Sequence, residues 1–353
     1  MPFLSLTGAP GSSGEGGQPA ESLAPLLPLW ERLAASTGQA DPFCCAPAWQ
    51  LSFLETVTPG KRLFCHTQAG SLAVFTEFQA DHKRVFLAPP ESGWLFGCPL
   101  LGPAAGDVLA AVLEYLDEAH PDAVPHLILS GIQPRGPLAA LLLHRFGEGY
   151  AFFRHGISVQ CAASLAGGVD GYLSRRSANH RAKLKKAARR AKAAGVSFTR
   201  VIPATAAETA ALYARMQAVE ARSWKGLEHC GMGEAPAREF YAALVQRLAA
   251  KGMLRAIMAQ RDGEDIGFIF GGLCGGTYRG QQFSYAATER ALSLGNLLQM
   301  ETLEWLCEEG IRRYDMGPVT GPRMEYKRHW TEEEHEIQTW LMVRRPGRGE
   351  MPC

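Results

Sequence analysis

The sequence lacks the cysteine and histidine spacing of a metal site or a disulfide framework. Its nine cysteines are scattered along the chain, and no two of them form a C-x-x-C pair. Its ten histidines show neither an H-x-x-x-H pair nor a cluster with cysteine at ligand spacing. We therefore expect reduced thiols, as in a cytosol, and no bound metal.

The chain also lacks a long apolar run and an excess of charge of either sign. No apolar stretch reaches the ~20 residues that a helix needs to cross a bilayer. The 36 Lys and Arg residues and 35 Asp and Glu residues leave a net charge of +1, which argues against a protein that coats nucleic acid through overall basic charge. The first 22 residues have no basic start and no apolar core of a secretion signal. We expect a cytoplasmic protein with a flexible leader.

A length of 353 residues accommodates two domains. Strand-like and helix-like patterns alternate in both halves, which predicts an α/β (α+β) fold. The predicted parts are a leader at 1–22, a first domain at 23–160, a second domain at 161–345 and a tail at 346–353. In the second domain we expect a β-meander over 254–287, with a hairpin turn at Asp262-Gly263.

Acidic residues are absent from Gly171 to Arg200, where lysine and arginine recur every second or third position. The pattern predicts a helix from Ser177 to Ala194 that ends at Gly195. Its charge has three interpretations: an anion-facing role for Arg181 and Lys185, a solvated face, or contact with a nucleic-acid duplex. No helix-turn-helix accompanies it, so sequence-specific DNA binding is not expected.

A second candidate lies in "ALSLGNLLQ", residues 291–299, where a strand, a turn and a helix follow one another. The free N–H groups at such a helix start suit a pyrophosphate. Helix capping alone also explains serine and glycine there.

Two further stretches place polar side chains beside turns. In "EARSWKG", residues 220–226, the ordinary interpretation is a helix C-terminal cap, and the functional one makes Glu220 a base and Trp224 and Lys225 part of a pocket wall. In "YDMGPVTGPRMEYKRHW", residues 314–330, we expect a strand to end at Asp315, where α/β sheets usually bind ligands. An ordinary loop with an aromatic anchor explains that stretch equally well.

These stretches, in this order, resemble one family. The basic "S-x-N-x-R-x-x-L" helix, "SWKG", the Asp-Gly hairpin, "SLGNLL", "YDMG" and "EYKRHW" are similar to those of the cellulose-biosynthesis-associated, BioF-like group of GNAT-superfamily acyltransferases. That group is similar in fold to the Fem-type aminoacyl transferases. The resemblance covers roughly residues 25 to 345. It implies two GNAT-like domains in tandem, each a mixed, mostly antiparallel sheet flanked by helices.

The resemblance also implies a donor site. The pyrophosphate of acetyl-CoA or another acyl-CoA would lie on the loop formed by Ser293, Leu294, Gly295 and Asn296. The usual loop reads Q/R-x-x-G-x-G/A, and here Ser293 replaces the first glycine. Fem-type relatives have similarly altered loops and take the acyl group from aminoacyl-tRNA. The identity of the donor therefore stays open.

An N-acyltransferase must hold both substrates, accept a proton from the amine and stabilise an oxyanion. We assign Glu220 or Asp315 as the base and Tyr326 as the proton donor. A backbone N–H within 284–286 would meet the carbonyl oxygen. The remaining substrate-binding candidates are Arg181, Lys185, Trp224, Lys225, Tyr285 and Lys327.

The leading hypothesis is transfer from acyl-CoA to a small or sugar-linked amine. One alternative is an aminoacyl-tRNA-dependent transferase, in which the basic helix touches the tRNA. The other is a non-catalytic GNAT-fold subunit of a polysaccharide system.

Overall fold

The computed structural model describes residues 4–6, 23–39, 41–81, 83–91, 93–319 and 321–345. The chain divides into two compact units, one made of Met1–Val159 with His335–Cys353 and the other of Gln160–Glu334. The predicted tail and most of the predicted leader lie outside the described residues. Within that leader, Leu4–Leu6 form strand β1, which the sequence analysis did not anticipate.

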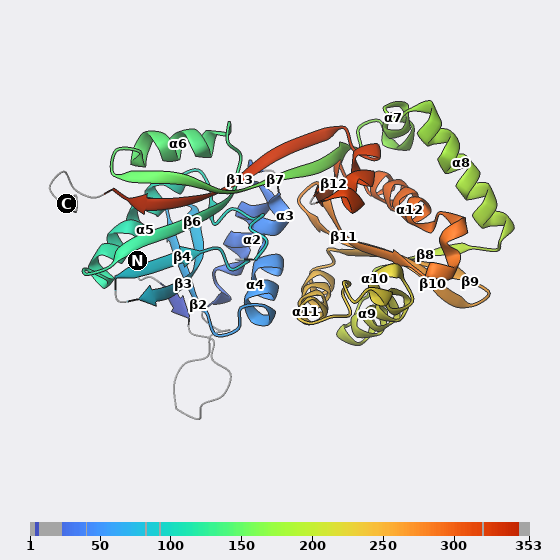
Figure 1. Cartoon of the computed structure of the whole chain (residues 1–353), viewed down its shortest axis with the longest axis horizontal. Helices are drawn as coiled ribbons and strands as arrows, with labels where there is room; N and C mark the ends of the chain where they lie inside the picture. The colour runs from blue at the N-terminus through green and yellow to red at the C-terminus, as the bar shows by residue number, and fades with distance from the viewer. Residues whose placement is uncertain are drawn as a thin grey trace, which may run out of the picture. The chain divides into compact units, whose positions relative to one another are not determined.

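The first unit combines a mixed sheet with helices (Figure 1). Its strands are β1 (Leu4–Leu6), β2 (Arg62–Gln68), β3 (Ser71–Asp81), β4 (Arg84–Ala88), β5 (Leu100–Leu101) and β6 (Val124–Ile132). Its helices are α2 (Leu27–Ala35), α3 (Pro42–Cys45), α4 (Pro47–Thr56), α5 (Ala105–Ala119) and α6 (Pro137–Phe146). Strands β1 to β4 pair antiparallel in chain order, and β4 then pairs in parallel with β6.

The second unit repeats this plan. Its strands are β8 (Ser197–Val201), β9 (Leu254–Arg261), β10 (Glu264–Cys274), β11 (Thr277–Tyr285) and β12 (Arg313–Pro318). Its helices are α7 (Gly168–Ser174), α8 (Ala178–Ala193), α9 (Ala206–Ala221), α10 (Trp224–Leu227), α11 (Ala237–Ala250) and α12 (Leu294–Glu308), with 3-10 turns η1 (Ala287–Leu292) and η2 (Pro322–His329). Figure 1 shows α9 and α11 on one side of β9–β11, and α8 and α12 on the other.

The pairing order confirms the expected tandem of mixed sheets. In the second unit β8 to β11 pair antiparallel, and β11 pairs in parallel with β12 after helix α12. In the first unit the corresponding parallel pair, β4 and β6, also follows a meander and encloses a helix, α5. Two strands, β7 (Tyr150–Ser164) and β13 (Glu333–Arg344), each run along the chain from one unit into the other.

Local chemistry accounts for several boundaries. Asp262 and Gly263 have φ angles of 53° and 81°, the left-handed backbone that a two-residue hairpin turn requires, and Arg261 pairs with Glu264 as predicted.

Two expectations about the ends of elements were wrong. Strand β12 continues to Pro318, so Asp315 lies inside it. Helix α9 ends at Ala221, and the Ser223 hydroxyl caps a new helix, α10, so the Trp-Lys-Gly corner is not a helix C-terminal cap.

The first unit fills the space beyond its short parallel pair with its own chain. After β4 the chain turns back, and within the segment 93–101 Leu100–Leu101 pair with β3. The Ser130 hydroxyl in β6 donates to the Gly97 carbonyl, and a Cβ on Gly131 would lie 2.6 Å from the Phe96 carbonyl oxygen. Among the described residues, the segment therefore packs closely against β6 on one side and β3 on the other.

A buried carboxyl group holds this filling segment in place. Glu91 is fully buried, and burial raises its pKa to about 8. Its carboxyl oxygens accept hydrogen bonds from Trp49 Nε1 and from the Gly97 N–H. The Glu91 side chain thus links helix α4, through Trp49, to the backbone at Gly97.

We expect Glu91→Ala to lower the free energy of unfolding by about 2–4 kcal/mol, because it leaves two buried N–H groups without an acceptor and opens a void. Urea denaturation followed by circular dichroism measures this. Glu118→Ala, at an exposed position of α5, is the matched control and should change stability little. Equal stabilities for the two variants would contradict this account of the segment.

Candidate active site

The strands β11 and β12 pair only over their first residues. Thr277–Arg279 lie opposite Arg313–Asp315, and no further pairing between the two strands is found among the described residues. Beyond that point β11 runs on to Tyr285 and β12 to Pro318. We call the place where they part the β11–β12 split.

One edge of β11 faces this split with its backbone. The Ala286 N–H donates to the Ile266 carbonyl, and Ser284 pairs with Phe268, so the backbone groups of 284 and 286 point to β10. Alternation along the strand sends the N–H and C=O groups of Phe283 and Tyr285 to the opposite edge. Lys225 Nζ, which donates to the Phe283 carbonyl at 2.9 Å, agrees with this orientation. Two N–H groups therefore point toward the split.

A first polar cluster lies beside β11. Glu220, only 1% exposed at the end of α9, accepts hydrogen bonds from the Met232 N–H at 2.9 Å and from the Ser284 hydroxyl. Lys225 Nζ also donates to Gln282 Oε1 at 2.7 Å. Burial lowers the pKa of Lys225, and the charge of Glu220 partly offsets that effect.

A second polar cluster lies beside β12. Asp315, also 1% exposed, accepts a hydrogen bond from the Gly317 N–H at 2.6 Å and lies 3.7 Å from Arg279 Nε. Lys327 Nζ donates to the Pro318 carbonyl at 2.7 Å. Burial and the Arg279 charge lower the pKa of Lys327 to about 7, against the opposing effect of Asp315.

Gly317 makes this second cluster possible. Its φ angle is +76°, and a Cβ there would lie 2.1 Å from Arg279 Nη1. Only glycine leaves room for the guanidinium beneath β12.

Aromatic side chains join the two clusters. Phe283 has Lys225 Nζ 5.7 Å from its ring centre, and the Tyr326 ring packs edge-on against it at 5.7 Å. Burial raises the pKa of Tyr326, so its hydroxyl stays protonated at neutral pH. Trp224 is 40% exposed, with the Arg323 guanidinium 4.7 Å from its ring.

The start of α12 lies against the same strand. A Cβ on Gly295 would lie 2.9 Å from the Phe283 ring and 3.4 Å from that of Tyr285. The preceding turn, η1, is fixed because Glu289 accepts two hydrogen bonds from Arg261, at 2.7 and 2.8 Å. Ser293 has φ 58°, a left-handed backbone that glycine adopts more easily. Leu294 is buried, and Asn296 is exposed.

The basic helix α8 has a structural part and an exposed part. Arg181 donates to the carbonyls of Leu173 at 3.3 Å and Arg176 at 2.5 Å, and so closes the end of α7. Lys185 is exposed. Near the other end Arg190 donates to the Ala291 carbonyl, in the turn before α12. The second half of α8 therefore adjoins the candidate donor loop.

The structure thus brings Glu220, Lys225, Asp315, Tyr326 and Lys327 to the two sides of one split. The sequence did not single out Arg279, Gln282 or the side chain of Ser284. Polar side chains are common in antiparallel strands, so the sequence carries no clear signal for them. Of the backbone N–H groups expected within 284–286, those of Ser284 and Ala286 point to β10, so only that of Tyr285 faces the split. Within the described ranges, no group of three or more His, Cys, Asp or Glu side chains is placed to hold a metal ion.

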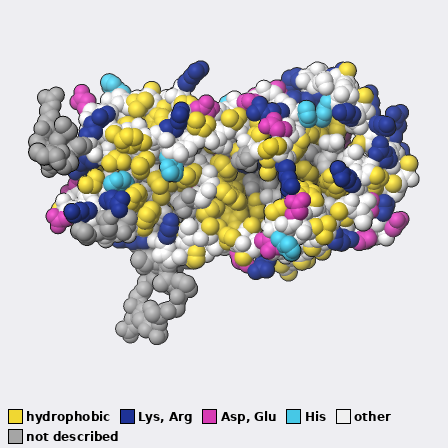
Figure 2. Space-filling view, in the orientation of Figure 1, with side chains coloured by type: hydrophobic (Ala, Val, Ile, Leu, Met, Phe, Trp, Pro, Cys, Tyr) yellow, Lys and Arg dark blue, Asp and Glu magenta, His cyan; other side chains and the backbone are white. Residues whose placement is uncertain are grey.

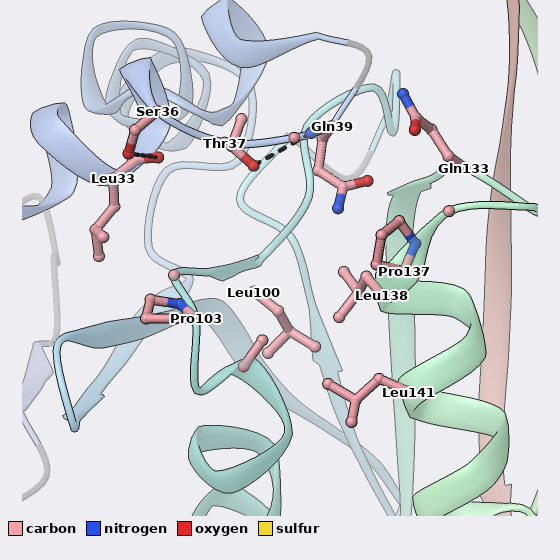
Figure 3. A pocket seen from close by; sticks show the side chains of 14 residues that line it. Leu33, Ser36, Thr37, Gln39, Leu100, Pro103, Gln133, Pro137, Leu138 and Leu141 are labelled. Carbon is pink, nitrogen blue, oxygen red and sulfur yellow. Dashed lines mark hydrogen bonds between the residues drawn. The ribbon is translucent and has the colours of Figure 1, made fainter.

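A cavity of about 470 Å³ lies in the first unit, between the end of α2 and the starts of α5 and α6 (Figure 3). Leucine and proline side chains such as Leu100, Leu141 and Pro137 form most of its wall, with Gln39 and Gln133 at its rim. It contains none of the predicted site residues.

Comparison with known proteins identifies the second unit. Residues 178–328 match the family described as an acetyltransferase (GNAT) domain. This stretch is a GNAT acyltransferase domain. The match begins at α8 and ends in η2, so the GNAT domain contains the split, both polar clusters and the α12 start. No curated protein matches the chain significantly.

Solved structures share the fold at low sequence identity. FemX is 11% identical over 88% of this chain and 94% of its own, with a TM-score of 0.62. A conserved protein of unknown function from Bacteroides thetaiotaomicron VPI-5482 is 12% identical over 84% and 90%, with a TM-score of 0.57. L-PGS from Bacillus licheniformis is 14% identical over 96% of each chain, with a TM-score of 0.56. None of the described helices combines the length and apolar character that crossing a membrane requires.

We expect Ser293→Gly to raise the free energy of unfolding by about 0.5–1 kcal/mol, because relief of the left-handed backbone outweighs the entropy that glycine adds to the unfolded chain. Urea denaturation measures the change. Ser293→Ala, which removes the hydroxyl but keeps the strain, should not stabilise the protein. A stabilised alanine variant would show that the hydroxyl, and not the backbone, carries the effect.

Proposed function

We propose that the chain is an N-acyltransferase that moves an acyl group from acyl-CoA to the amine of a small or sugar-linked acceptor. The observation that carries this proposal is the β11–β12 split, with two backbone N–H groups on its edge and a helix start beside it. The N–H groups of Phe283 and Tyr285 would donate to the acyl carbonyl oxygen and stabilise the oxyanion. The donor pyrophosphate would rest on the first turn of α12, from Ser293 to Asn296.

The remaining side chains fit defined roles around that donor. Tyr326 packs against Phe283, where its protonated hydroxyl would donate a hydrogen bond to the leaving sulfur. Lys225 fixes the β11 edge by its bond to the Phe283 carbonyl. Trp224 and Tyr285 would form walls for substrate. In the described part of the first unit, residues 96–98 pack against β6 after the parallel pair, which supports a donor site in the GNAT domain.

Binding of acetyl-CoA should raise the melting temperature by several degrees at a ligand concentration near 100 Kd, which corresponds to about 2.7 kcal/mol. Asn296→Asp should abolish most of this rise, because it adds a negative charge where the pyrophosphate would lie. The change suits an exposed first helical turn, so the free protein should remain as stable. A thermal-shift titration with acetyl-CoA, longer acyl-CoAs and free CoA measures this. An undiminished rise in the variant would contradict the placement of the donor.

The second candidate function is aminoacyl transfer from tRNA, and helix α8 is the observation that favours it. Elsewhere in the GNAT domain most arginines have carboxylate partners, such as Arg215 with Asp265 and Arg255 with Glu309. In the described part of the chain, no carboxylate forms an ion pair with the lysines and arginines of α8. In Figure 2, dark blue side chains gather at the edge that α8 occupies in Figure 1. Such unneutralised charge suits a phosphate backbone.

Charge reversal separates the two donors. If tRNA is the donor, Lys185→Glu combined with Arg189→Glu should weaken tRNA binding at least tenfold and reduce its salt dependence. The same variant should leave the acetyl-CoA thermal shift intact, because the contact of α8 with the turn before the 293–296 loop is made by Arg190, which is unchanged. Filter binding at several salt concentrations measures the first effect. Unchanged tRNA binding would remove the case for an RNA-borne donor.

A further inference from the structure

Both carboxylates of the site hold other groups of the protein in place. Glu220 accepts bonds from the Met232 N–H and the Ser284 hydroxyl, and a Cβ on Gly231 would lie 2.3 Å from its Oε1. Asp315 accepts a bond from the Gly317 N–H and faces Arg279. Protonation of either group would weaken hydrogen bonds that fix β11 and β12. Both carboxylates are therefore better described as positioning residues.

Lys327 is in a different situation. Its Nζ donates to the Pro318 carbonyl at 2.7 Å, at the end of β12 where the strand has left β11. A neutral amine can make that bond through one N–H and keep its lone pair for a proton. The side chain is nearly buried, and Tyr326, its neighbour in sequence, packs against Phe283 on the other side of the split.

The surroundings of Lys327 favour the neutral amine. The groups that act on it are Arg279 from β11, Asp315 from β12, Cys161 from β7 and Lys225 from α10. Burial and the two cations lower its pKa, whereas Asp315 and Cys161 raise it, and the balance is a pKa of about 7. A lysine in this range is neutral in part of the molecules at physiological pH, as a general base must be.

We propose that Lys327, in place of Glu220 or Asp315, accepts the proton of the attacking amine. This inference rests on the proposed acyl transfer. The amine nitrogen forms a bond to the acyl carbon and gives one proton to Lys327 Nζ. The carbon–sulfur bond then breaks, and the ammonium of Lys327 returns the proton to the leaving sulfur, while Tyr326 only donates a hydrogen bond to it. Lysine ends neutral, and the products are the amide and free CoA.

The first test is kinetic and uses acetyl-CoA as donor and hydroxylamine as acceptor. Because hydroxylamine is uncharged at neutral pH, its own protonation does not change the measured rate there. Release of the CoA thiol is followed against pH. Lys327→Met should lower kcat by about 10²–10⁴-fold. Lys327→Arg keeps the positive charge and the bond to Pro318 but cannot give up a proton. It should lose as much activity as the methionine variant. An active arginine variant would overturn the proposal, because charge alone would then suffice.

The second test changes the pKa of Lys327 by substituting charged residues around it. Lys225→Gln removes a cation that lowers the pKa of Lys327, so the rise of activity with pH should shift to higher pH. Asp315→Asn removes an anion that raises it, so the shift should be to lower pH. A merely structural role for Lys327 predicts neither opposite shift. A pH profile that stays fixed in both variants would contradict the base role.

A direct measurement checks the titration independently of turnover. In protein labelled with ¹³C at the lysine Cε, the Lys327 signal is assigned by its absence in Lys327→Arg, and its shift is followed from pH 5 to 11. Titration near neutrality supports the proposal, and titration at the ordinary lysine pKa overturns it.

The kinetic outcomes separate the two proposals. If neither the wild type nor any variant releases CoA above the blank, the proposed acyl transfer itself fails, and the base role fails with it. If release persists in Lys327→Met, only the base role fails.

Discussion

The parting of β11 and β12 after Arg279 and Asp315 is the constraint on which the rest of the GNAT domain depends. A sheet edge that loses its partner exposes backbone N–H and C=O groups, and such groups need new partners when they are not in water. Here the lysines supply them: Lys225 takes the Phe283 carbonyl and Lys327 the Pro318 carbonyl. The N–H groups of Phe283 and Tyr285 face the same space. These polar contacts line the split in which we propose that acyl transfer takes place.

The two units show how one plan gives different results. Both contain a meander, a helix and a parallel strand in the same order. In the first unit the chain turns back after β4 to pack against β3 and β6, and Glu91 holds it there through Trp49 and Gly97. In the GNAT domain η1 leads directly into α12, and Gly295 brings that helix against Phe283. The two units therefore differ in the segment that follows β4 in the first unit and β11 in the GNAT domain.

Much of the fold could be predicted from the sequence, because local signals determine it. The Asp262-Gly263 turn and the basic helix ending at Gly195 depend on periodicity and on glycine at left-handed positions. The extent of β12 and the start of α10 could not be predicted. Asp315 looks like a strand end because Gly317 and Pro318 follow it, and only the pairing with β7 extends the strand. The Ser223 cap competes with a helix C-terminal cap that the same residues can form.

The candidate site, too, could be predicted from the sequence only in part. The sequence singled out Glu220, Lys225, Asp315 and Lys327 from their position near turns, but it could not distinguish their roles. Those roles depend on contacts between distant segments, such as Glu220 with Ser284 and Asp315 with Arg279. Charge coupling of Lys327 to Arg279 and Lys225 is likewise a property of the folded chain. The interpretation of Lys327 as a base could therefore arise only from the structure.

The most direct measurement of the central claim is the amide NMR signal of Phe283 and Tyr285 in ¹⁵N-labelled protein titrated with acetyl-CoA. If the split receives the acyl group, both N–H signals should shift as a hydrogen bond to the thioester oxygen forms, together with those of Leu294 and Gly295 at the start of α12. Free CoA should shift only the α12 pair. Binding of acetyl-CoA that leaves Phe283 and Tyr285 unchanged would contradict the claim that acyl transfer takes place in the β11–β12 split.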